Sequence, residues 1–369
     1  MKSTSPAGPV RPDPGPLGST RQSLEGRERL AAQLSEVGEE AARAAGGWED
    51  VWLCVGGEPV RLRFAGPAMA ERLLPALRHL ATDPSDPAAL TIHVWDSAST
   101  STEPPRPVWG RDAYREHGVI DGFFGDGFYT VYPRGVGALN VVDVASRRAW
   151  FWITDAARLL LPEQGAPLRL LLNLWLADRD VQLVHGAAVG REDGCVLLIG
   201  PSGAGKSSTA LSCLDSGLRH LGEDYCLLRH GDPPHVFSIY SSAKVELATL
   251  ARMPRLHDFV MAMPDDAGGE KAVLDLHAEH PSRMMRSAPL KAIALPRIVA
   301  GPETRVASGS AGAAMVAVAP STMLQLPGNG PRLMRMLSAT IRAVPCFRLE
   351  VGSDPTRIAP VLESLLDRA

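Results

Sequence analysis

The sequence predicts an α/β protein in two parts: a smaller α+β domain over residues 23–177 and a layered α/β domain over residues 178–369. Three observations predict this division. The length of 369 residues fits about two domains of ordinary size. All seven tryptophans lie at or before Trp175, whereas four of the five lysines lie at or after Lys206. Strand-like and helix-like segments alternate after residue 178, as in α/β layer folds.

The composition excludes several classes of protein. Apolar residues make up 45% of the chain and charged residues 21%, which excludes a largely disordered protein. The net charge of -3 argues against a surface dedicated to nucleic acid or to an anionic membrane. Five scattered cysteines without a C-x-x-C pair indicate reduced thiols. With no secretory leader and no apolar stretch long enough for a membrane span, we expect a cytoplasmic protein.

The first half begins with a tail and continues with short alternating elements. Residues 1–22 contain five prolines among Gly and Ser, which predicts a flexible tail. A helix should follow, with Leu30, Leu34, Val37 and Ala41 on one face. Apolar runs and alternating patterns then predict strands over 51–55, 60–64 and 90–95, a helix over 68–80 weakened by Pro75, an antiparallel meander over 122–153, and a helix over 167–176.

The second half shows the alternation expected of an α/β domain. A strand should start at Val181, and further elements are expected over 196–199 (strand), 206–215 (helix) and 218–221 (strand). The glycine- and alanine-rich segment 307–314 is predicted to be a mobile loop. The last helix should have Asp354 as N-cap, Pro355 in its first turn and a buried stripe of Ile358, Val361 and Leu365.

Residues 200–207, Gly-Pro-Ser-Gly-Ala-Gly-Lys-Ser, match the phosphate-binding loop motif G-x-x-x-x-G-K-[ST]. Glycines allow consecutive backbone N–H groups to turn inward around phosphate oxygens, and the following helix N-terminus adds partial positive charge. The Lys206 ammonium reaches the β- and γ-phosphates, and the Ser207 hydroxyl can ligate Mg²⁺. An apolar strand enters the loop and a helix leaves it. We therefore expect ATP and Mg²⁺ to be bound by Gly200, Pro201, Ser202, Gly203, Ala204, Gly205, Lys206, Ser207 and Ser208.

Two further segments narrow the class of site. The strand ending at Leu221 leads into the acidic pair Glu223-Asp224, which can organise Mg²⁺ and act as a general base towards a hydroxyl. His185-Gly186 precedes the strand of the phosphate-binding loop. Taken alone, His185 could be a core histidine and the acidic pair a surface turn. Their combination with the loop favours a catalytic site.

Together these segments resemble the kinase domain of HPr kinase/phosphorylase, which shares its core with phosphoenolpyruvate carboxykinase. The resemblance lies in His185-Gly186, the loop 200–207, the segment Ser208-Thr-Ala-Leu and the acidic pair, and it covers about 45 residues. It implies that Asp224 is the general base, that His185 supports it, and that Lys206 and Ser207 hold the triphosphate and Mg²⁺. The implied metal ligands are Ser207, Glu223 and Asp224, and the implied catalytic residues are Lys206, His185, Glu223 and Asp224.

Two positions differ from the family pattern. Glu223 stands where the family has the first Asp of an Asp-Asp pair, and the segment from Ser238 to Lys244 stands where an E-x-R-G segment is expected. Divergent relatives of this kind resemble the serine kinases of lasso peptide biosynthesis, which act on a precursor peptide.

The sequence thus predicts a kinase that uses ATP and Mg²⁺ to phosphorylate a serine-type hydroxyl of a peptide or a small metabolite. The first half would be a recognition domain for the acceptor. The sequence does not decide whether the protein is a monomer or a homo-oligomer. Three alternatives remain: a non-catalytic nucleotide-binding regulator, a phosphotransferase acting on a carboxylate or phosphate, and a scaffold for peptide-modifying partners.

Other cations could belong to the site or be solvated surface groups. Lys244 and Lys271 could contact phosphate or an acidic substrate. A rim for anions could be formed by Arg252, Arg255, Arg283, Arg286 and Arg297.

Overall fold

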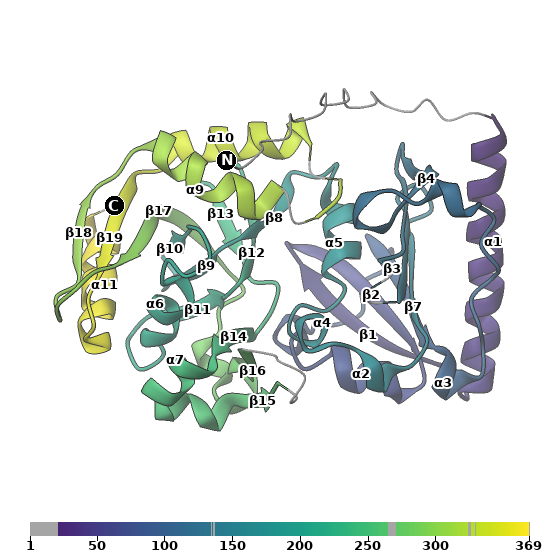
Figure 1. The fold of residues 1–369 in the computed structure, drawn as a ribbon, viewed down its shortest axis with the longest axis horizontal. Helices are drawn as coiled ribbons and strands as arrows, with labels where there is room; N and C mark the ends of the chain where they lie inside the picture. Colours follow the sequence, from purple (N-terminus) through teal and green to yellow (C-terminus); the bar gives the residue numbers. More distant parts are fainter. Residues whose placement is uncertain are drawn as a thin grey trace, which may run out of the picture.

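A computed structural model describes residues 21–133, 135, 137–264, 271–323, 326–328 and 330–368. Over these residues the chain is mixed α/β, with a seven-stranded sheet, a nine-stranded sheet and a small three-stranded sheet (Figure 1). Most of the predicted tail, residues 1–20, lies outside the described residues, and Arg21 and Gln22 already belong to the first helix.

The seven-stranded sheet is built entirely from residues before position 154. Its strand order is β1-β2-β3-β7-β6-β5-β4. The β2–β3 and β3–β7 pairs are parallel and the others are antiparallel, so the predicted meander is confirmed as β4 to β7. The strands are β1 (Trp48–Val55), β2 (Glu58–Ala65), β3 (Leu90–Asp96), β4 (Val119–Gly125), β5 (Phe128–Val131), β6 (Ala138–Asp143) and β7 (Arg148–Ile153).

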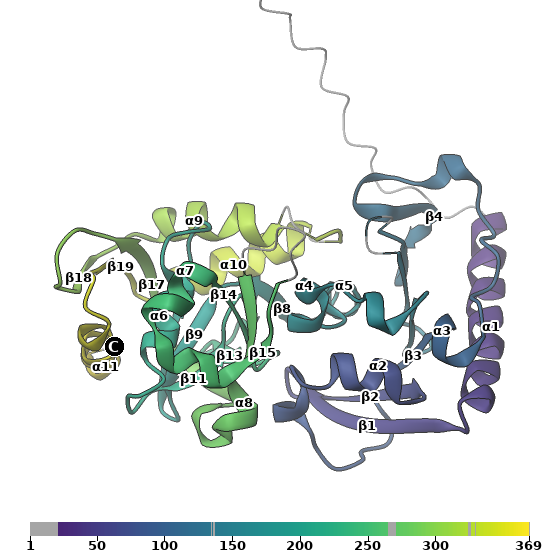
Figure 2. The same cartoon turned by 60° about the horizontal axis from the view of Figure 1, so that its bottom comes forward.

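Helices cover both faces of this sheet (Figure 2). On one face the predicted helix is confirmed as α1 (Arg21–Ala44), which buries Leu30 and Leu34 beside Trp150 and Trp152. On the other face lie α2 (Pro67–Leu73), α4 (Leu161–Gly165) and α5 (Arg169–Leu176); α3 (Ser97–Thr100) is a single turn. The predicted helix 68–80 is shorter than expected because it stops before Pro75, and only a 3-10 turn at Arg78–Leu80 follows.

The nine-stranded sheet has the order β11-β9-β10-β17-β13-β12-β8, with β19 pairing to both β17 and β18. The long strand β17 pairs in parallel with β10 and β19, and the remaining pairs are antiparallel. The three-stranded sheet has the order β14-β16-β15. The strands are β8 (Val181–His185), β9 (Ala187–Arg191), β10 (Gly194–Leu198), β11 (Arg219–Gly222), β12 (Tyr225–Arg229), β13 (His235–Phe237), β14 (Ser242–Glu246), β15 (Val260–Ala262), β16 (Lys271–Asp275), β17 (Ser287–Ile298), β18 (Arg305–Ser308) and β19 (Cys346–Val351).

Four helices enclose the nine-stranded sheet, two on each face. One face is covered by α6 (Lys206–Ser212), with Ala210 and the directly following Cys213, and by α11 (Ile358–Arg368), with Ile358, Leu362 and Leu365. The other face is covered by two helices that bury residues such as Ala314, Val318 and Leu337. These two helices are α9 (Ala311–Met323) and α10 (Pro331–Ala343); α7 (Leu247–Arg252) and α8 (Leu276–Glu279) lie beside the three-stranded sheet.

Two sequence predictions in this half are wrong. The segment 307–314 is not a loop, because Ala307 and Ser308 belong to β18 and Ala314 is fully buried in α9. The stripe of the last helix uses Leu362, which is fully buried, rather than Val361, which is only partly buried. The Asp354 cap is confirmed, since its carboxylate accepts from the Thr356 N–H at 3.0 Å, but it caps a short 3-10 turn that leads into α11.

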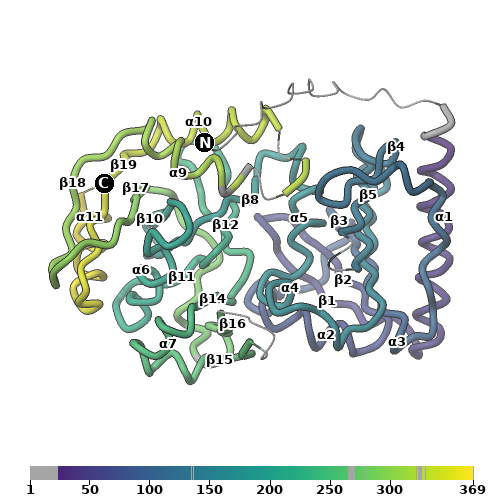
Figure 3. Tube along the Cα trace, in the orientation of Figure 1, coloured from purple at the N-terminus to yellow at the C-terminus, as the bar shows by residue number. Residues whose placement is uncertain are grey.

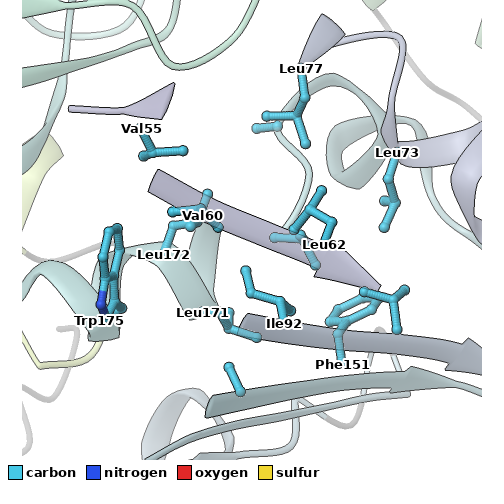
Figure 4. Packing of buried hydrophobic residues seen from close by; sticks show 14 of the residues in the cluster. Val55, Val60, Leu62, Leu73, Leu77, Ile92, Phe151, Leu171, Leu172 and Trp175 are labelled. Carbon is cyan, nitrogen blue, oxygen red and sulfur yellow. The ribbon is translucent and has the colours of Figure 1, made fainter. Parts of the chain in front are cut away.

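The two sheets meet through a shared hydrophobic core. The largest apolar cluster contains Val60 and Ile92 of the first sheet, Trp175 of α5 and Leu227 of the second sheet. Figure 4 shows Leu171, Leu172 and Trp175 lying near the strands of the first sheet. Helices α4 and α5 lie between the sheets, while α1 and α11 mark opposite ends of the molecule (Figure 3). A fragment beginning at residue 178 would therefore lose part of a core that it shares.

Among the described residues, no helix combines the length and the apolar character that a membrane span requires.

A buried histidine ties the second sheet to α6. The Nε2–H of His220 donates to the Ala210 carbonyl at 2.7 Å, and burial lowers the pKa of His220 to about 4. Because this value lies below the ordinary 6.5, the unfolded chain binds the proton more tightly. The contribution of His220 to stability is therefore present at pH 7 and falls as the pH drops from about 6.5 towards 4.

We expect His220→Gln, which keeps a donor but cannot ionise, to weaken the acid sensitivity of the fold. Between pH 7 and pH 5 its free energy of unfolding should fall by about 2 kcal/mol less than that of the parent. Urea unfolding at both pH values measures this difference. The exposed His257, changed to Gln, is the matched control, and an unaltered pH dependence in His220→Gln would contradict the assignment.

Candidate functional site

The predicted phosphate-binding loop connects β10 to α6. Gly205, the last residue before the helix, has φ +99°, a left-handed conformation that side chains other than glycine rarely adopt. A Cβ at this position would also lie 3.2 Å from the Ile298 side chain at the end of β17. The loop conformation therefore requires glycine here chiefly because of its positive φ, while the exposed Ile298 side chain could move aside to accept a Cβ.

Lys206 is buried at the start of α6. Its Nζ donates to the carbonyl oxygens of Gly200 at 2.8 Å and Pro201 at 3.1 Å. Burial lowers the pKa of the Lys206 ammonium, although the negative charges of Glu223 and Asp224 act in the opposite direction. The ammonium thus lies inside the loop whose phosphate ligand it is expected to contact.

His185 and the acidic pair meet where two strand connections run side by side. Only Gly186 separates β8 from β9, and only Glu223 and Asp224 separate β11 from β12. The Gly186 N–H donates to the Asp224 carbonyl at 3.1 Å, and a Cβ on Gly186 would lie 2.9 Å from the Leu198 carbonyl. A glycine is required after His185 because the strand of the phosphate-binding loop passes so close.

The Asp224 carboxylate is held at both oxygens. Its Oδ1 lies 3.0 Å from His185 Nε2, and its Oδ2 accepts from Lys244 Nζ at 3.0 Å. Burial alone would raise the pKa of Asp224, but the hydrogen bond from His185 and the Lys244 ammonium together hold it well below its ordinary value. Its backbone has φ +68°, a conformation that Asp adopts more readily than most residues. Asp224 is therefore an ionised carboxylate in a fixed orientation.

Glu223 is buried beside it and has different partners. The Ser207 hydroxyl donates to its Oε1, and the Lys244 backbone N–H donates to its Oε2 at 2.9 Å. Burial and the charge of Asp224 raise the pKa of Glu223, against the opposing effect of these two donors. The two acids therefore differ in protonation: Asp224 stays ionised, whereas Glu223 takes up a proton more readily.

These groups line one pocket of about 130 Å³. Of the predicted site residues, His185, Ser202, Gly203, Gly205, Lys206, Ser207, Ser208, Glu223 and Asp224 face it. Gly200, Pro201 and Ala204 do not line it; Gly200 and Pro201 contribute the carbonyls that accept from Lys206.

The oxygen donors of the site suit a hard divalent cation such as Mg²⁺. Ser207 and Glu223 are in direct contact, and Asp224 follows in the chain. In the parts of the chain that the structure describes, no cluster of three or more His, Cys, Asp or Glu side chains is arranged to hold a metal ion. A cation at Ser207 would therefore need oxygen ligands from a bound substrate as well.

The structure adds residues that sequence reasoning did not assign to the pocket. Glu246, Thr249 and Ile298 also line it. Glu246 could have been found from strand periodicity, since it shares a face of β14 with Lys244. Ile298 could not, because only the parallel pairing of β17 with β10 brings the end of that strand to the loop.

Lys244 is a site residue rather than a solvated cation. Lys271 also lines the pocket from an exposed position, as does Arg252. The other proposed rim arginines lie elsewhere. Arg255 and Arg283 both pair with Asp215, Arg286 donates to the carbonyls of His79 and Ala81, and Arg297 is exposed outside the pocket lining.

A larger cavity of about 340 Å³ lies away from the phosphate-binding loop. Both halves of the chain line it, including Asn140 of β6, Leu170 of α5 and Leu326. Arg169 in its wall donates to the Tyr225 hydroxyl at 2.6 Å, and the Tyr225 ring is centred 5.5 Å from that of His185. The smaller pocket is the candidate functional site, because among the described residues the loop, the two carboxylates and the lysines converge there.

Comparison of the chain with protein-family models gave no match, and comparison with curated proteins gave none either.

Gly205→Ala tests whether the loop conformation serves ligand binding. We expect ATP binding to weaken about tenfold, because a left-handed residue other than glycine costs about 1–2 kcal/mol. Calorimetric titration with ATP and Mg²⁺ measures the change. Gly217→Ala, at an exposed position after α6, is the matched control; equal affinities in both variants would show that the loop does not hold phosphate.

Proposed function

We propose that the protein is an ATP- and Mg²⁺-dependent kinase that transfers the γ-phosphoryl group to a serine-type hydroxyl. The observation that carries the proposal is the position of Asp224. An ionised carboxylate lies on the wall of the pocket that the phosphate-binding loop opens into, next to an acid that accepts from the loop's own Ser207. Phosphoryl transfer needs these two parts together: a cradle for phosphates and a group that accepts the hydroxyl proton.

Each side chain then has a defined role. The loop N–H groups and Lys206 bind the phosphates of ATP, and Asp224 accepts the proton of the attacking hydroxyl. A bond forms between the acceptor oxygen and phosphorus as the bond to the leaving diphosphate breaks. His185, at 3.0 Å from Asp224, orients the carboxylate.

The metal belongs beside the loop. Ser207, Glu223 and Asp224 supply the oxygen ligands that would hold Mg²⁺, which neutralises phosphate charge when it is bound. Glu223, whose pKa burial raises, would ionise fully as the cation approaches, since a positive charge favours the carboxylate form.

The proposed function agrees with the resemblance to HPr kinase/phosphorylase. The His-Gly segment, the loop and the acidic pair that carry the resemblance converge at one pocket. The differences at Glu223 and in the segment 238–244 lead us to propose a peptide acceptor, such as the precursor of a lasso peptide, or a small hydroxyl metabolite.

Asp224→Asn tests the role of the general base. Transfer from labelled ATP to serine-containing precursor peptides should fall about 10²- to 10⁴-fold, because Asn cannot take the proton. The affinity for ATP measured without Mg²⁺ should stay near that of the parent, since the loop and Lys206 are intact. Mass spectrometry detects the added phosphate, and slow ATP hydrolysis, with water as acceptor, provides a second measure of the same step.

Each alternative function predicts a different result for ATP binding, phosphoryl transfer and peptide binding by the parent protein. A nucleotide-binding regulator binds ATP but shows neither transfer nor hydrolysis in the parent. A phosphotransferase acting on a carboxylate gives an acid-labile product instead of an acid-stable phosphoserine. A scaffold binds peptide with the same affinity in the presence and absence of ATP.

The first half of the chain is proposed to orient the acceptor. The larger cavity supports this role, because it lies between the halves and is linked to the site through Arg169 and Tyr225. Its lining combines apolar side chains such as Leu168 and Leu170 with the polar Asn140, Glu163 and Arg169, and such a mixture can both bind and orient a ligand.

Leu170→Ala enlarges this cavity without touching the phosphate-binding loop. We expect KM for the phosphorylated acceptor to rise about tenfold, because an apolar contact is lost, while KM for ATP stays unchanged. Steady-state kinetics with each substrate varied in turn separates the two effects. The exposed Leu160, changed to Ala, is the control, and a rise confined to KM for ATP would contradict the assigned role.

A further inference from the structure

Lys244 contacts both acids of the site at once. Its Nζ donates to Asp224 Oδ2 at 3.0 Å, and its backbone N–H donates to Glu223 Oε2 at 2.9 Å. The residue lies in β14, whose pairing with β16 fixes its backbone through the register Lys244–Val273. The position of the Asp224 carboxylate is therefore set from a third segment of chain, in addition to β8 and the β11–β12 connection.

The stem of Lys244 packs against a glycine from the first half of the chain. Gly165, the last residue of α4, is buried, and a Cβ there would lie 3.2 Å from Lys244 Cε and 3.3 Å from Val273. The Ser242 hydroxyl donates to the Gly165 carbonyl, which holds α4 against β14. A side chain at position 165 would push on the lysine stem, because the strand behind it is fixed.

Two of the three lysines that line the pocket, Lys206 and Lys244, have different partners. Lys206 donates only to carbonyl oxygens of its own loop, whereas Lys244 donates to a carboxylate. Only 16% of the Lys244 side chain is exposed, against 26% for Asp224. A pair this well shielded from water keeps its geometry better than a surface ion pair does.

We propose that Lys244 is a positioning residue of the transfer reaction, which holds the Asp224 carboxylate against His185, and that Gly165 provides the space its stem requires. The catalytic role of Asp224 in this inference rests on the proposed function. The geometric part does not, because the contacts among Lys244, Asp224 and His185 can be measured without any substrate.

The charge and the packing can be removed separately. Lys244→Met keeps the length of the stem but removes the ammonium, and Gly165→Ala keeps the ammonium but displaces the stem. We expect kcat to fall about 100-fold in Lys244→Met and about tenfold in Gly165→Ala, because a misplaced catalytic group loses rate steeply with distance. KM for ATP should change little in either variant, since the phosphate-binding loop is untouched.

Matched controls exclude general loss of stability. Lys291→Met removes a lysine that pairs with Asp193 away from the pocket, and Gly312→Ala adds a methyl where no atom lies within 4 Å. Both should behave as the parent. Thermal unfolding of all variants identifies any that fail to fold.

A nuclear magnetic resonance experiment tests the geometry directly. The ¹⁵N resonances of the His185 imidazole, assigned with His185→Gln, report its hydrogen bond to Asp224. They should shift in Lys244→Met and in Gly165→Ala but not in the two controls. Unchanged resonances in folded Lys244→Met would overturn the proposal.

The two measurements fail in different ways. If the parent protein transfers no phosphate but the His185 resonances shift, the proposed function is wrong and only the geometric part stands, in which Lys244 holds the Asp224 carboxylate against His185. If the parent transfers phosphate and Lys244→Met raises only KM for ATP, Lys244 is a nucleotide-binding residue and the positioning role is wrong. Unaltered kinetics in Gly165→Ala would overturn the role of the glycine.

Discussion

The arrangement of the second half depends on two adjacent carboxylates, of which Glu223 is buried and Asp224 is partly shielded from water. A buried charge without partners costs several kcal/mol, so each oxygen of Glu223 and Asp224 must be matched by a donor. The donors come from three separate segments: His185 from β8, Ser207 from α6 and Lys244 from β14. The hydrogen bonds to this pair of acids therefore connect α6, β8 and the three-stranded sheet to one another.

The sheet topology brings together the two short connections that carry His185 and the acidic pair. Strands β8 and β9, and likewise β11 and β12, are nearly continuous, and each pair is interrupted at the same level of the sheet. At these interruptions one backbone hydrogen bond, from the Gly186 N–H to the Asp224 carbonyl, still joins the two connections, while the side chains of His185, Glu223 and Asp224 face the pocket beside the phosphate-binding loop. Gly186 allows the close approach, because any side chain there would meet the Leu198 carbonyl.

Local signals could be predicted from the sequence and long-range partners could not. The phosphate-binding loop is a contiguous motif, and apolar runs or alternating patterns predict the strands of the first sheet and β8, β10 and β11 of the second, but not β9 or β12 to β19. The pairing of Lys244 with Asp224 joins residues 20 positions apart on different sheets, and no spacing rule fixes it. The segment 307–314 was misjudged because glycine and alanine suggested a loop. Alanine is the best helix former, and burial of Ala314 against the sheet stabilises α9.

The boundary near residue 178 separates the two large sheets, but residues on both sides of it surround the smaller pocket and the larger cavity. The short helix α4 precedes that boundary, yet its residues contact both halves of the chain. Gly165 contacts the stem of Lys244, which lines the smaller pocket. Glu163 lines the larger cavity, and its Oε1 lies 3.7 Å from Arg169 Nη2. Helix α4, five residues long, therefore bounds the larger cavity through Glu163 and contacts, through Gly165, the lysine that donates to Asp224. Residues before the boundary thus belong to the surroundings of the acidic pair as much as residues after it do.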